Sequence, residues 1–368
     1  MPFAITLDIG TTNIQSFLTD SFSKKQVDYL TVKNSQIFYG EDVISRLGLS
    51  LRNKTNEEKI RKSVINDLTL LVSLILKRNN LTFDFVDKVI ACGNSAMQHI
   101  LLGLPLSGLA TAPFCPVNAR KTIYTTLKDV GVSNGTTKKH IPFIFLPNIG
   151  GFVGSDALCV IFETEIYKSK RNVLAIDLGT NGEIILGNEK RILVASTSAG
   201  PAFESWHIKC GVYGSTMTDV MHDLLEGGIV DETGCMKDES TKFNINGQAI
   251  IVTRKDIRAF QLAKAAISTG INLLRQYFED KEIHKVYLTG VFGAKINKKS
   301  ARHAGLLPDD VGLDKIEVRQ NAALLGATKF LSVKDLRRHI ESILKIVEHI
   351  ELHKEPRFQE TFASSIRF

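Results

Sequence analysis

Two copies of the pattern Asp-x-Gly-Thr stand out among the residues that could do chemistry. One begins at Asp8 and the other at Asp177, and each follows an apolar, β-rich run. Glycine permits a tight turn that approaches a ligand closely, and the N–H groups of such a turn can hold an anion. An aspartate beside a phosphate needs a cation between them, and Mg²⁺ binds carboxylates together with phosphate oxygens. The pattern therefore predicts a Mg²⁺–nucleotide site with Asp8 and Asp177 as metal ligands.

The repetition of the pattern is informative in itself. One such turn is commonly a plain hairpin, but two of them after apolar strands in corresponding halves indicate an internal repeat. The half-chain period indicates duplicated domains rather than a solenoid. The turns supply the expected nucleotide-binding groups, which are Gly10, Thr11, Thr12 and Asn13 in the first half and Gly179, Thr180, Asn181 and Gly182 in the second.

Apolar periodicity predicts the elements that must position these turns. In each half, one strand enters the turn, a second leaves it and a third follows: Phe3–Gly10, Ile14–Thr19 and Lys25–Val32, then Val173–Gly179, Ile184–Leu186 and Arg191–Ser196. Two further strands are expected at Lys88–Cys92 and Lys285–Thr289. Helices are expected at Glu57–Arg78, Ser95–Leu102, Ser155–Tyr167 with Ser155 as its cap, Asp256–Phe278, Asn321–Leu331 and Val333–Leu352.

The order of these elements predicts an α/β fold. Strand hairpins followed by alternating helices and strands give two domains with mixed sheets, over residues 1–168 and 169–368. The polar, turn-rich stretch 227–248 is interpreted as an insertion in the second domain.

Composition narrows the class of protein. With 368 residues, 43% of them hydrophobic and 23% charged, the chain has material for a core and is not of the disordered class. It has no apolar run of the roughly 18 residues that a membrane helix needs, and its first residues lack a signal-peptide pattern. The net charge of +7 comes from small basic groups without interleaved aromatic residues. We therefore expect a cytoplasmic protein without membrane or nucleic-acid partners, although the basic groups leave an acidic partner open.

The five cysteines are scattered along the chain. They are Cys92, Cys115, Cys159, Cys210 and Cys235, and no two of them form a Cys-x-x-Cys pair. This spacing argues against a disulfide framework, a zinc ribbon and a ferredoxin-type cluster, all of which need closely grouped or evenly paired thiols. We expect no iron–sulfur cluster in this chain.

A third glycine-containing turn completes a recognisable pattern. The segment YLTGVFG, Tyr287–Gly293, follows a strand late in the second half. Together with the two aspartate turns, it resembles the actin, sugar-kinase and heat-shock-chaperone ATPase (ASKHA) superfamily. The resemblance implies duplicated ribonuclease-H-like domains with ATP in an interdomain cleft. It also assigns Asp8–Asn13 and Asp177–Glu183 to the phosphates, and Gly290, Phe292 and Gly293 to the adenosine.

The same resemblance suggests further site residues. Asp156 stands where the superfamily often places a carboxylate near Mg²⁺ or the attacking water. In the hypothesis that follows, Asp156 or Glu183 orients that water. Gln261, Lys264 and Ser268 lie on one side of the expected long helix, where they could line the adenosine or form a plain exposed face.

Longer segments resemble one branch of this superfamily, the ATP-dependent reductive activators of corrinoid proteins. The matching segments are NSQIFYGEDVISR (Asn34–Arg46), GNSAMQHILLG (Gly93–Gly103), APFCP (Ala112–Pro116), PNIGGFVGSDAL (Pro147–Leu158), IDLGTNGEIILG (Ile176–Gly187), STSAGPAFESWHIKCG (Ser196–Gly211), DIRAFQLAKAAISTGI (Asp256–Ile271) and RFQETFASSIRF (Arg357–Phe368). Within them, the small-residue segment 196–205, with Gly200, could line the phosphate cleft or form the partner surface. His207 and Cys210 are interpreted as structural.

This resemblance implies a function and a set of partners. ATP binding and hydrolysis would drive the reduction of Co(II) to Co(I) on the corrinoid protein of a methyltransferase system. The electron would come from a separate ferredoxin-like donor, because family members usually carry an iron–sulfur module for which this chain's cysteine spacing offers no counterpart. A homodimer is also implied. Two positions depart from the superfamily pattern: Asn13 replaces a third threonine, and Val291 stands where a second glycine is common.

Two other functions remain open at the level of sequence. A small-molecule kinase of the same superfamily would share the two turns, since fold alone does not fix function. A nucleotide-gated binding module without a reaction of its own would share them as well.

Overall fold

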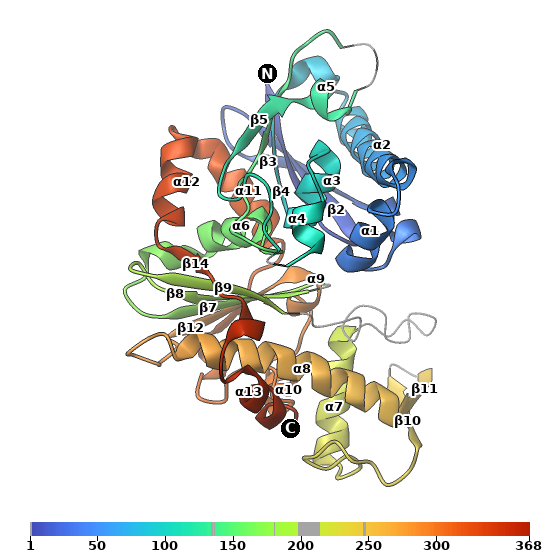
Figure 1. Ribbon diagram of the computed structural model, residues 1–368, viewed down its shortest axis with the longest axis vertical. Coiled ribbons are helices and arrows are strands. Elements are labelled where there is room, and N and C mark those ends of the chain that lie inside the picture. Colours follow the sequence, from blue (N-terminus) through green and yellow to red (C-terminus); the bar gives the residue numbers. More distant parts are fainter. Residues whose placement is uncertain are drawn as a thin grey trace. The chain divides into compact units, whose positions relative to one another are not determined.

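The computed structural model describes residues 2–112, 114–133, 135, 137–179, 181–197, 214–245 and 248–368. The chain forms two compact units. Unit 1 comprises Met1–Glu165 with Ala322–His349, and unit 2 comprises Ile166–Asn321 with Ile350–Phe368. Each unit is α/β with a mixed sheet, as expected (Figure 1). The expected domain ranges remain a prediction, and the units differ from them chiefly because residues 322–349 group with unit 1.

The unit 1 sheet has the strand order β3-β2-β1-β4-β6-β5. Strand β1 pairs antiparallel with β2, which pairs antiparallel with β3, while β1 pairs parallel with β4. Strand β6 continues the parallel part, and β5 closes it antiparallel. The strands are β1 Phe3–Ile9, β2 Asn13–Asp20, β3 Gln26–Lys33, β4 Val86–Gly93, β5 Ile123–Thr126 and β6 Pro142–Phe145. The first aspartate turn therefore lies at the carboxyl end of β1, beside the end of β4.

Helices of unit 1 bury apolar stripes against this sheet. In α2, the expected stripe of Ile60, Val64, Leu68, Leu71 and Ile75 is confirmed as fully buried. The helices and remaining strand are α1 Val43–Ser50, α2 Lys54–Arg78, α3 Ser95–Leu102, α4 Ser107–Ala110, α5 Leu127–Val130, α6 Ser155–Thr164, α11 Ala322–Lys329, α12 Leu336–Leu344 and β14 Val347–His349. Short 3-10 turns occur at Ser35–Tyr39, Phe83–Phe85 and Phe330–Ser332.

Unit 2 repeats the first four strands of this topology. Its strands run β13-β12-β7-β8-β9, so that β9-β8-β7-β12 corresponds to β3-β2-β1-β4, with the same antiparallel and parallel pairings. The bounds are β7 Val173–Leu178, β8 Gly182–Gly187, β9 Ile192–Thr197, β12 Lys285–Thr289 and β13 Ile316–Val318. The internal repeat predicted from the sequence is confirmed by this order.

The helices of unit 2 pack around a second apolar core. They are α7 Gly214–Glu226, α8 Arg254–Arg275, α9 Gly290–Gly293, α10 Lys298–His303 and α13 Phe358–Ser364, with 3-10 turns at Ile166–Lys168, Leu313–Lys315 and Leu352–Lys354. Helix α8 begins with a capping box, in which Thr253 and Asp256 each accept a backbone N–H of the other. It packs on β8 and β9. None of the helices in the described part of the chain has both the length and the apolar character that a membrane crossing requires.

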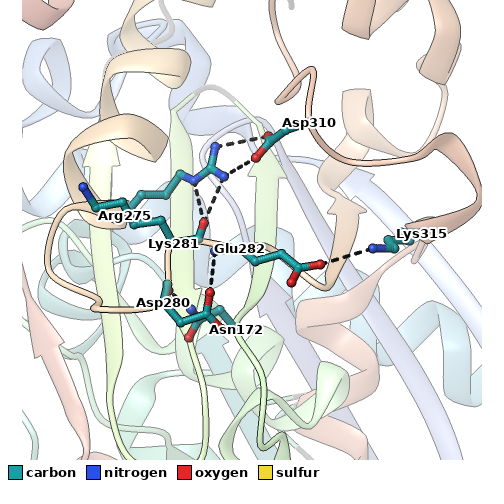
Figure 2. Close-up of polar contacts among 7 residues, drawn as sticks. All are labelled: Asn172, Arg275, Asp280, Lys281, Glu282, Asp310 and Lys315. Carbon is teal, nitrogen blue, oxygen red and sulfur yellow. Dashed lines mark hydrogen bonds and ion pairs between the residues drawn. The ribbon is translucent and has the colours of Figure 1, made fainter.

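A polar clamp fixes the connection from α8 to β12 (Figure 2). The guanidinium of Arg275, at the end of α8, donates to the carbonyl oxygen of Lys281 at 2.9 and 3.1 Å and forms a two-point ion pair with Asp310. The hydrogen bond from Arg275 lowers the pKa of the Asp310 carboxyl. Asn172, just before β7, donates to the carbonyl oxygen of Asp280 at 2.5 Å. The clamp therefore ties the entry of β12 to the entry of β7, its parallel neighbour.

One expectation for secondary structure was wrong in part. The helix expected over Val333–Leu352 ends at Leu344 and is followed by the short strand β14. The cause is Arg120, whose guanidinium donates to the carbonyl oxygens of Leu344 and Val347 and so satisfies groups that a longer helix would have paired. The stretch 227–248, interpreted as an insertion, contains β10 Ser240–Ile245, which forms a hairpin with β11 Gln248–Thr253.

Two boundary details also differ from expectation. The N-cap of α6 is Gly154, and Ser155 is the first helical residue. The glycine-containing turn expected within Tyr287–Gly293 is formed by the single-turn helix α9.

Helix α11 packs on α6 so closely that glycine is required at the contact. A Cβ atom on Gly326 would lie 2.0 Å from the carbonyl oxygen of Cys159. We predict that Gly326→Ala destabilises the protein by about 1–3 kcal/mol through overpacking, although alanine is the better helix former. The matched control is Gly48→Ala in α1, where an added Cβ meets nothing within 4 Å. This variant should gain roughly 0.5–1 kcal/mol. Urea denaturation measures both, and equal effects of the two substitutions would contradict the packing argument.

Candidate functional site

The first aspartate turn is held in place by two asparagines. Within it, the Gly10 amide donates to the Asn13 carbonyl oxygen at 3.0 Å. The Asn34 side chain donates to the Gly10 carbonyl oxygen at 2.9 Å, and its backbone amide donates to that of Thr12 at 2.9 Å. The side-chain amide of Asn94 donates to the Thr11 hydroxyl oxygen at 3.1 Å. Since that oxygen accepts a bond from Asn94, the hydroxyl hydrogen of Thr11 is available to another acceptor.

A buried charged side chain supports Asn34 in turn. Arg46 is fully buried, and its guanidinium donates to the Gly40 carbonyl oxygen at 2.8 Å and to the Gln36 side chain at 3.3 Å. The same Gln36 oxygen accepts from Asn34 at 3.3 Å. A buried charge is tolerated only when it is well hydrogen-bonded, so this network fixes one geometry. It gives the segment Asn34–Arg46 a physical role as the support of the turn.

Helix α6 brings a second carboxylate to unit 1's candidate site. Its N-terminus lies directly on the turn that follows β4, because a Cβ on Gly154 would come within 2.2 Å of the Gly93 carbonyl oxygen. The Ser155 hydroxyl donates to that same oxygen at 3.1 Å and accepts from the Gly93 amide at 3.2 Å. Asp156 is therefore fixed in the first turn of α6, beside the end of β4 and one strand away from Asp8.

Two buried thiols lie among these carboxylates. The Cys92 thiol is hydrogen-bonded to Cys159 and lies 3.9 Å from the Asp8 carboxylate. Hydrogen bonding to Cys159 and burial raise the pKa of Cys92 well above its usual range, and burial raises the pKa of Cys159. The charges of Asp8 and Asp156 raise both pKa values further. The structure thus gathers Asp8 and Asp156 around one pair of neutral thiols.

The pKa of Asp156 results from two opposed effects. Burial raises it to about 6, while backbone N–H groups at the start of α6 lower it. Because burial outweighs these donors, the carboxyl group releases its proton near pH 6. Such a group is suited to accept a proton at neutral pH.

The second aspartate turn lies in unit 2, between β7 and β8. Asp177 is paired in register with Glu183 across the antiparallel strands, which places both carboxylates on the same face of the sheet. The Gly179 amide donates to the Asn181 carbonyl oxygen at 3.0 Å, which makes this turn one residue shorter than that of unit 1, where the Gly10 amide donates to Asn13. Ser196 on β9 lies 3.5 Å from the Glu183 carboxylate.

The glycine turn at α9 packs against this same strand end. Gly290 has φ +83°, and an added Cβ would lie 2.4 Å from a carboxylate oxygen of Asp177 and 2.3 Å from the Leu178 carbonyl oxygen. Phe292 and Gly293 are buried, whereas Val291 is largely exposed. Within unit 2, the structure therefore brings the second aspartate turn and the glycine turn expected to bind adenosine together.

The three residues of α8 that were expected to line the adenosine or form an exposed face differ in their burial and contacts. The Gln261 amide donates to the carbonyl oxygens of Thr233 and Ile366, and the Lys264 ammonium donates to that of Arg367. Both side chains are buried, and burial lowers the pKa of Lys264 to about 8. They hold residues of the C-terminal segment, so they do not form an exposed face. Ser268 is partly exposed and accepts a weak bond from Asn272.

Some predicted residues lie outside the described part of the chain. These are Thr180, Gly200, His207 and Cys210. Sequence reasoning in turn missed Asn34, Asn94 and Ser155 as supports of the site. The only signal for them was their presence in the family-like segments, because one sequence does not reveal which polar side chains are buried.

Comparison with known families adds evidence independent of this geometry. The family model "RACo middle region" matches residues 3–169, and "C-terminal domain of RACo the ASKHA domain" matches residues 171–216 and 210–368. The chain belongs to the RACo family. The ASKHA fold expected from the sequence is thereby confirmed, and this fold implies nucleotide binding.

Characterised relatives of this RACo chain carry related names. The "Corrinoid activation enzyme RamQ" of Eubacterium limosum is 30% identical, with 100% of this chain and 70% of that protein covered. A "[Co(II) methylated amine-specific corrinoid protein] reductase" of Methanosarcina barkeri is 26% identical, with 98% and 75% covered. A solved "Reductive activator for corrinoid,iron-sulfur protein" is 26% identical with a TM-score of 0.86. This chain is covered completely by that comparison and spans 66% of the solved chain.

The raised pKa of Asp156 makes a prediction about stability. The folded chain holds this proton more tightly than the unfolded chain, whose ordinary value is 3.8, so the free energy of unfolding should fall as the pH rises from about 4 to 6. Asp156→Asn should remove this loss and stabilise the protein at neutral pH by up to about 3 kcal/mol. Chemical denaturation across this pH range in a chelating buffer measures the effect. The control is Asp87→Asn at an exposed carboxylate; if both variants keep the wild-type pH dependence, the assignment fails.

The thiols make a separate prediction about reactivity. Cys115 and Cys235 are exposed, whereas Cys92 and Cys159 are buried with raised pKa values. We expect alkylation of the native protein to modify the exposed pair readily and to leave the buried pair unmodified until denaturant is added, since the thiolate is the reactive form. Peptide mass spectrometry after timed labelling gives the rates. Equal labelling of Cys92 and Cys115 in the native protein would show that the buried cluster is not formed.

Proposed function

We propose that this chain binds Mg²⁺–ATP through its two aspartate turns and couples ATP hydrolysis to the reductive activation of a corrinoid protein. The cobalt of that partner would be reduced from Co(II) to Co(I) with an electron from a separate iron–sulfur donor. The observation that carries the proposal is the pair of equivalent hairpin turns, each with an aspartate at a strand end, in a chain of the RACo family. The names of the relatives supply the class of partner.

Backbone geometry supports the fit of a nucleotide. Gly10 and Gly179 each open a hairpin turn at the corresponding strand end, and the Thr11 hydroxyl hydrogen is available to a phosphate oxygen. Gly290 adopts a positive φ where a side chain would collide with Asp177, so the turn comes as close to the strand end as backbone atoms allow. Such close approach of glycine backbone is typical of turns that accept phosphate or a nucleotide. Gly10, Gly179 and Gly290 would therefore hold the nucleotide.

Asp8 and Asp177 would hold Mg²⁺. A bound Mg²⁺ would neutralise phosphate charge and favour an in-line attack by water. The protein's own contribution is to place carboxylates and to move a proton. Asp156, whose pKa of about 6 leaves it largely ionised at neutral pH, is suited to orient the attacking water and accept its proton. Glu183, which shares a sheet face with Asp177, is the alternative for this role.

The electron is proposed to come from outside the chain. The hydrogen bond to Cys159 and burial raise the pKa of Cys92, and burial raises the pKa of Cys159 although its bond to Cys92 lowers it, so both thiols stay protonated, whereas a cluster is held by thiolates. These two cysteines are therefore poor cluster ligands. The further proposals of a homodimer and of a cytoplasmic location rest on the family resemblance and on composition.

The decisive experiment follows the cobalt directly. Wild-type chain, ATP, Mg²⁺ and a low-potential reductant should convert a Co(II) corrinoid protein to Co(I), seen by visible absorption. Asp177→Ala should reduce both ATP hydrolysis and this conversion by on the order of 10²-fold or more, because charge positioning supplies most catalysis in phosphoryl transfer. The matched control, Asp238→Asn at an exposed position of unit 2, should behave as wild type.

Three results would contradict the proposal. Conversion that proceeds equally without ATP, or equally in Asp177→Ala, would exclude ATP-driven activation. Transfer of the γ-phosphate to a small-molecule acceptor, with no stimulation by a corrinoid protein, would favour a kinase instead.

A further inference from the structure

Helices α7 and α10 of unit 2 bring two histidines and a glutamate together. His222 and Glu226 lie one turn apart on α7, and His303 is the last residue of α10. The two helices are in contact. The Nδ1 atoms of His222 and His303 are 2.5 Å apart, and Nε2 of His222 lies 3.5 Å from a carboxylate oxygen of Glu226. One ligand atom from each residue can be chosen so that all three lie within 4.8 Å of one another.

The cluster is partly buried and partly open. His222 is only 8% exposed, whereas Glu226 and His303 are exposed. Two ring nitrogens at 2.5 Å form a hydrogen bond only if one carries a hydrogen and the other a lone pair. The Nδ1 lone pair of one ring therefore points at the Nδ1 atom of the other, and an ion that displaces the shared hydrogen would meet a lone pair from each ring. The described polar contacts of the two histidines are with each other and with Glu226, not with the aspartate turns.

We propose that His222, Glu226 and His303 bind one divalent transition-metal ion of the Zn²⁺ class. Two imidazoles with one carboxylate form a ligand set typical of zinc, and imidazole favours such ions over Mg²⁺ and Ca²⁺. Tetrahedral binding would move the two nitrogens from 2.5 Å to about 3.3 Å apart, given zinc–nitrogen bonds of about 2.0–2.1 Å. The exposed His303, at the end of its helix, and the exposed Glu226 have room for this adjustment. Solvent on the open side supplies the fourth ligand.

The position of the site indicates a structural task. Helix α7 also contacts α9, the turn that begins at Gly290, and α10 follows α9 in the chain. An ion bound between α7 and α10 would tie together the elements on either side of that turn. A ligand that binds only the folded state stabilises it, so the ion should raise the stability of unit 2. This inference stands independently of the proposed corrinoid function.

The test uses the full chain, stripped of metal with a chelator and then dialysed against Zn²⁺ in the presence of excess Mg²⁺. We expect one tightly bound zinc and a higher thermal midpoint. His303→Ala and Glu226→Gln should each weaken zinc binding by at least about 10–100-fold and reduce the thermal shift accordingly. His140→Ala, at an exposed histidine of unit 1, is the matched control and should bind as wild type. Co²⁺ in place of Zn²⁺ should give visible absorption typical of nitrogen and oxygen ligands, without the thiolate-to-metal band of a cysteine site.

Two outcomes would overturn the proposal. The first is the absence of a stoichiometric tight zinc in the wild-type chain. The second is wild-type affinity in both His303→Ala and Glu226→Gln, which would place the ion elsewhere, or a thiolate band with Co²⁺, which would place it at cysteines. Since Glu226 is exposed, its variant keeps the test valid even if His303→Ala folds poorly. None of these measurements uses ATP or a corrinoid protein, so failure here leaves the proposed function unaffected.

Discussion

Close backbone packing on both sides of helix α6 is the constraint on which unit 1's candidate site depends. At one end, Gly154 lies so close to Gly93 that any side chain would collide with its carbonyl oxygen. Along its length, Gly326 of α11 lies equally close to the carbonyl oxygen of Cys159. A helix held at van der Waals limits by two glycine contacts has little freedom to shift, because packed interiors are as dense as crystals. Asp156, in the first turn of α6, is therefore held in a fixed position.

The two aspartate turns share a hairpin but differ in what supports them. In unit 1, the turn rests on Asn34, which is itself fixed by a network that ends in the buried charge of Arg46. In unit 2, the equivalent strand end is covered by the glycine turn at Gly290, which comes into contact with Asp177. The duplicated topology thus has one turn with a polar support and one that packs against the glycine turn at Gly290. This difference agrees with the expectation that both halves bind phosphate and that only the second half also binds the adenosine.

The regular part of this fold could be predicted from the sequence, and the irregular part could not. Period-3.6 apolar spacing locates α2, and the repeated strand–turn–strand pattern locates both hairpins, because burial imposes these periods directly. The end of α12 could not be found in this way, since it depends on Arg120, more than two hundred residues away in the chain. The roles of Asn34 and Arg46 could not be predicted either, because their burial depends on the tertiary structure and not on local sequence spacing. The roles of the aspartates in the site were inferred from motif and family resemblance, and they remain a proposal.

The burial of Asp156 bears on how nucleotide binding could do work in the proposed function. Keeping this carboxylate ionised in its buried position costs the folded chain up to about 3 kcal/mol at neutral pH. Positive charge near Asp8 and Asp156 would recover part of that cost in one nucleotide state and not in the other. A ligand shifts a conformational equilibrium only by its differential affinity for the two states, and a full reversal needs about 5.5 kcal/mol. In the proposed function, this buried carboxylate would supply part of the coupling, and hydrogen bonds at the two turns would supply the rest.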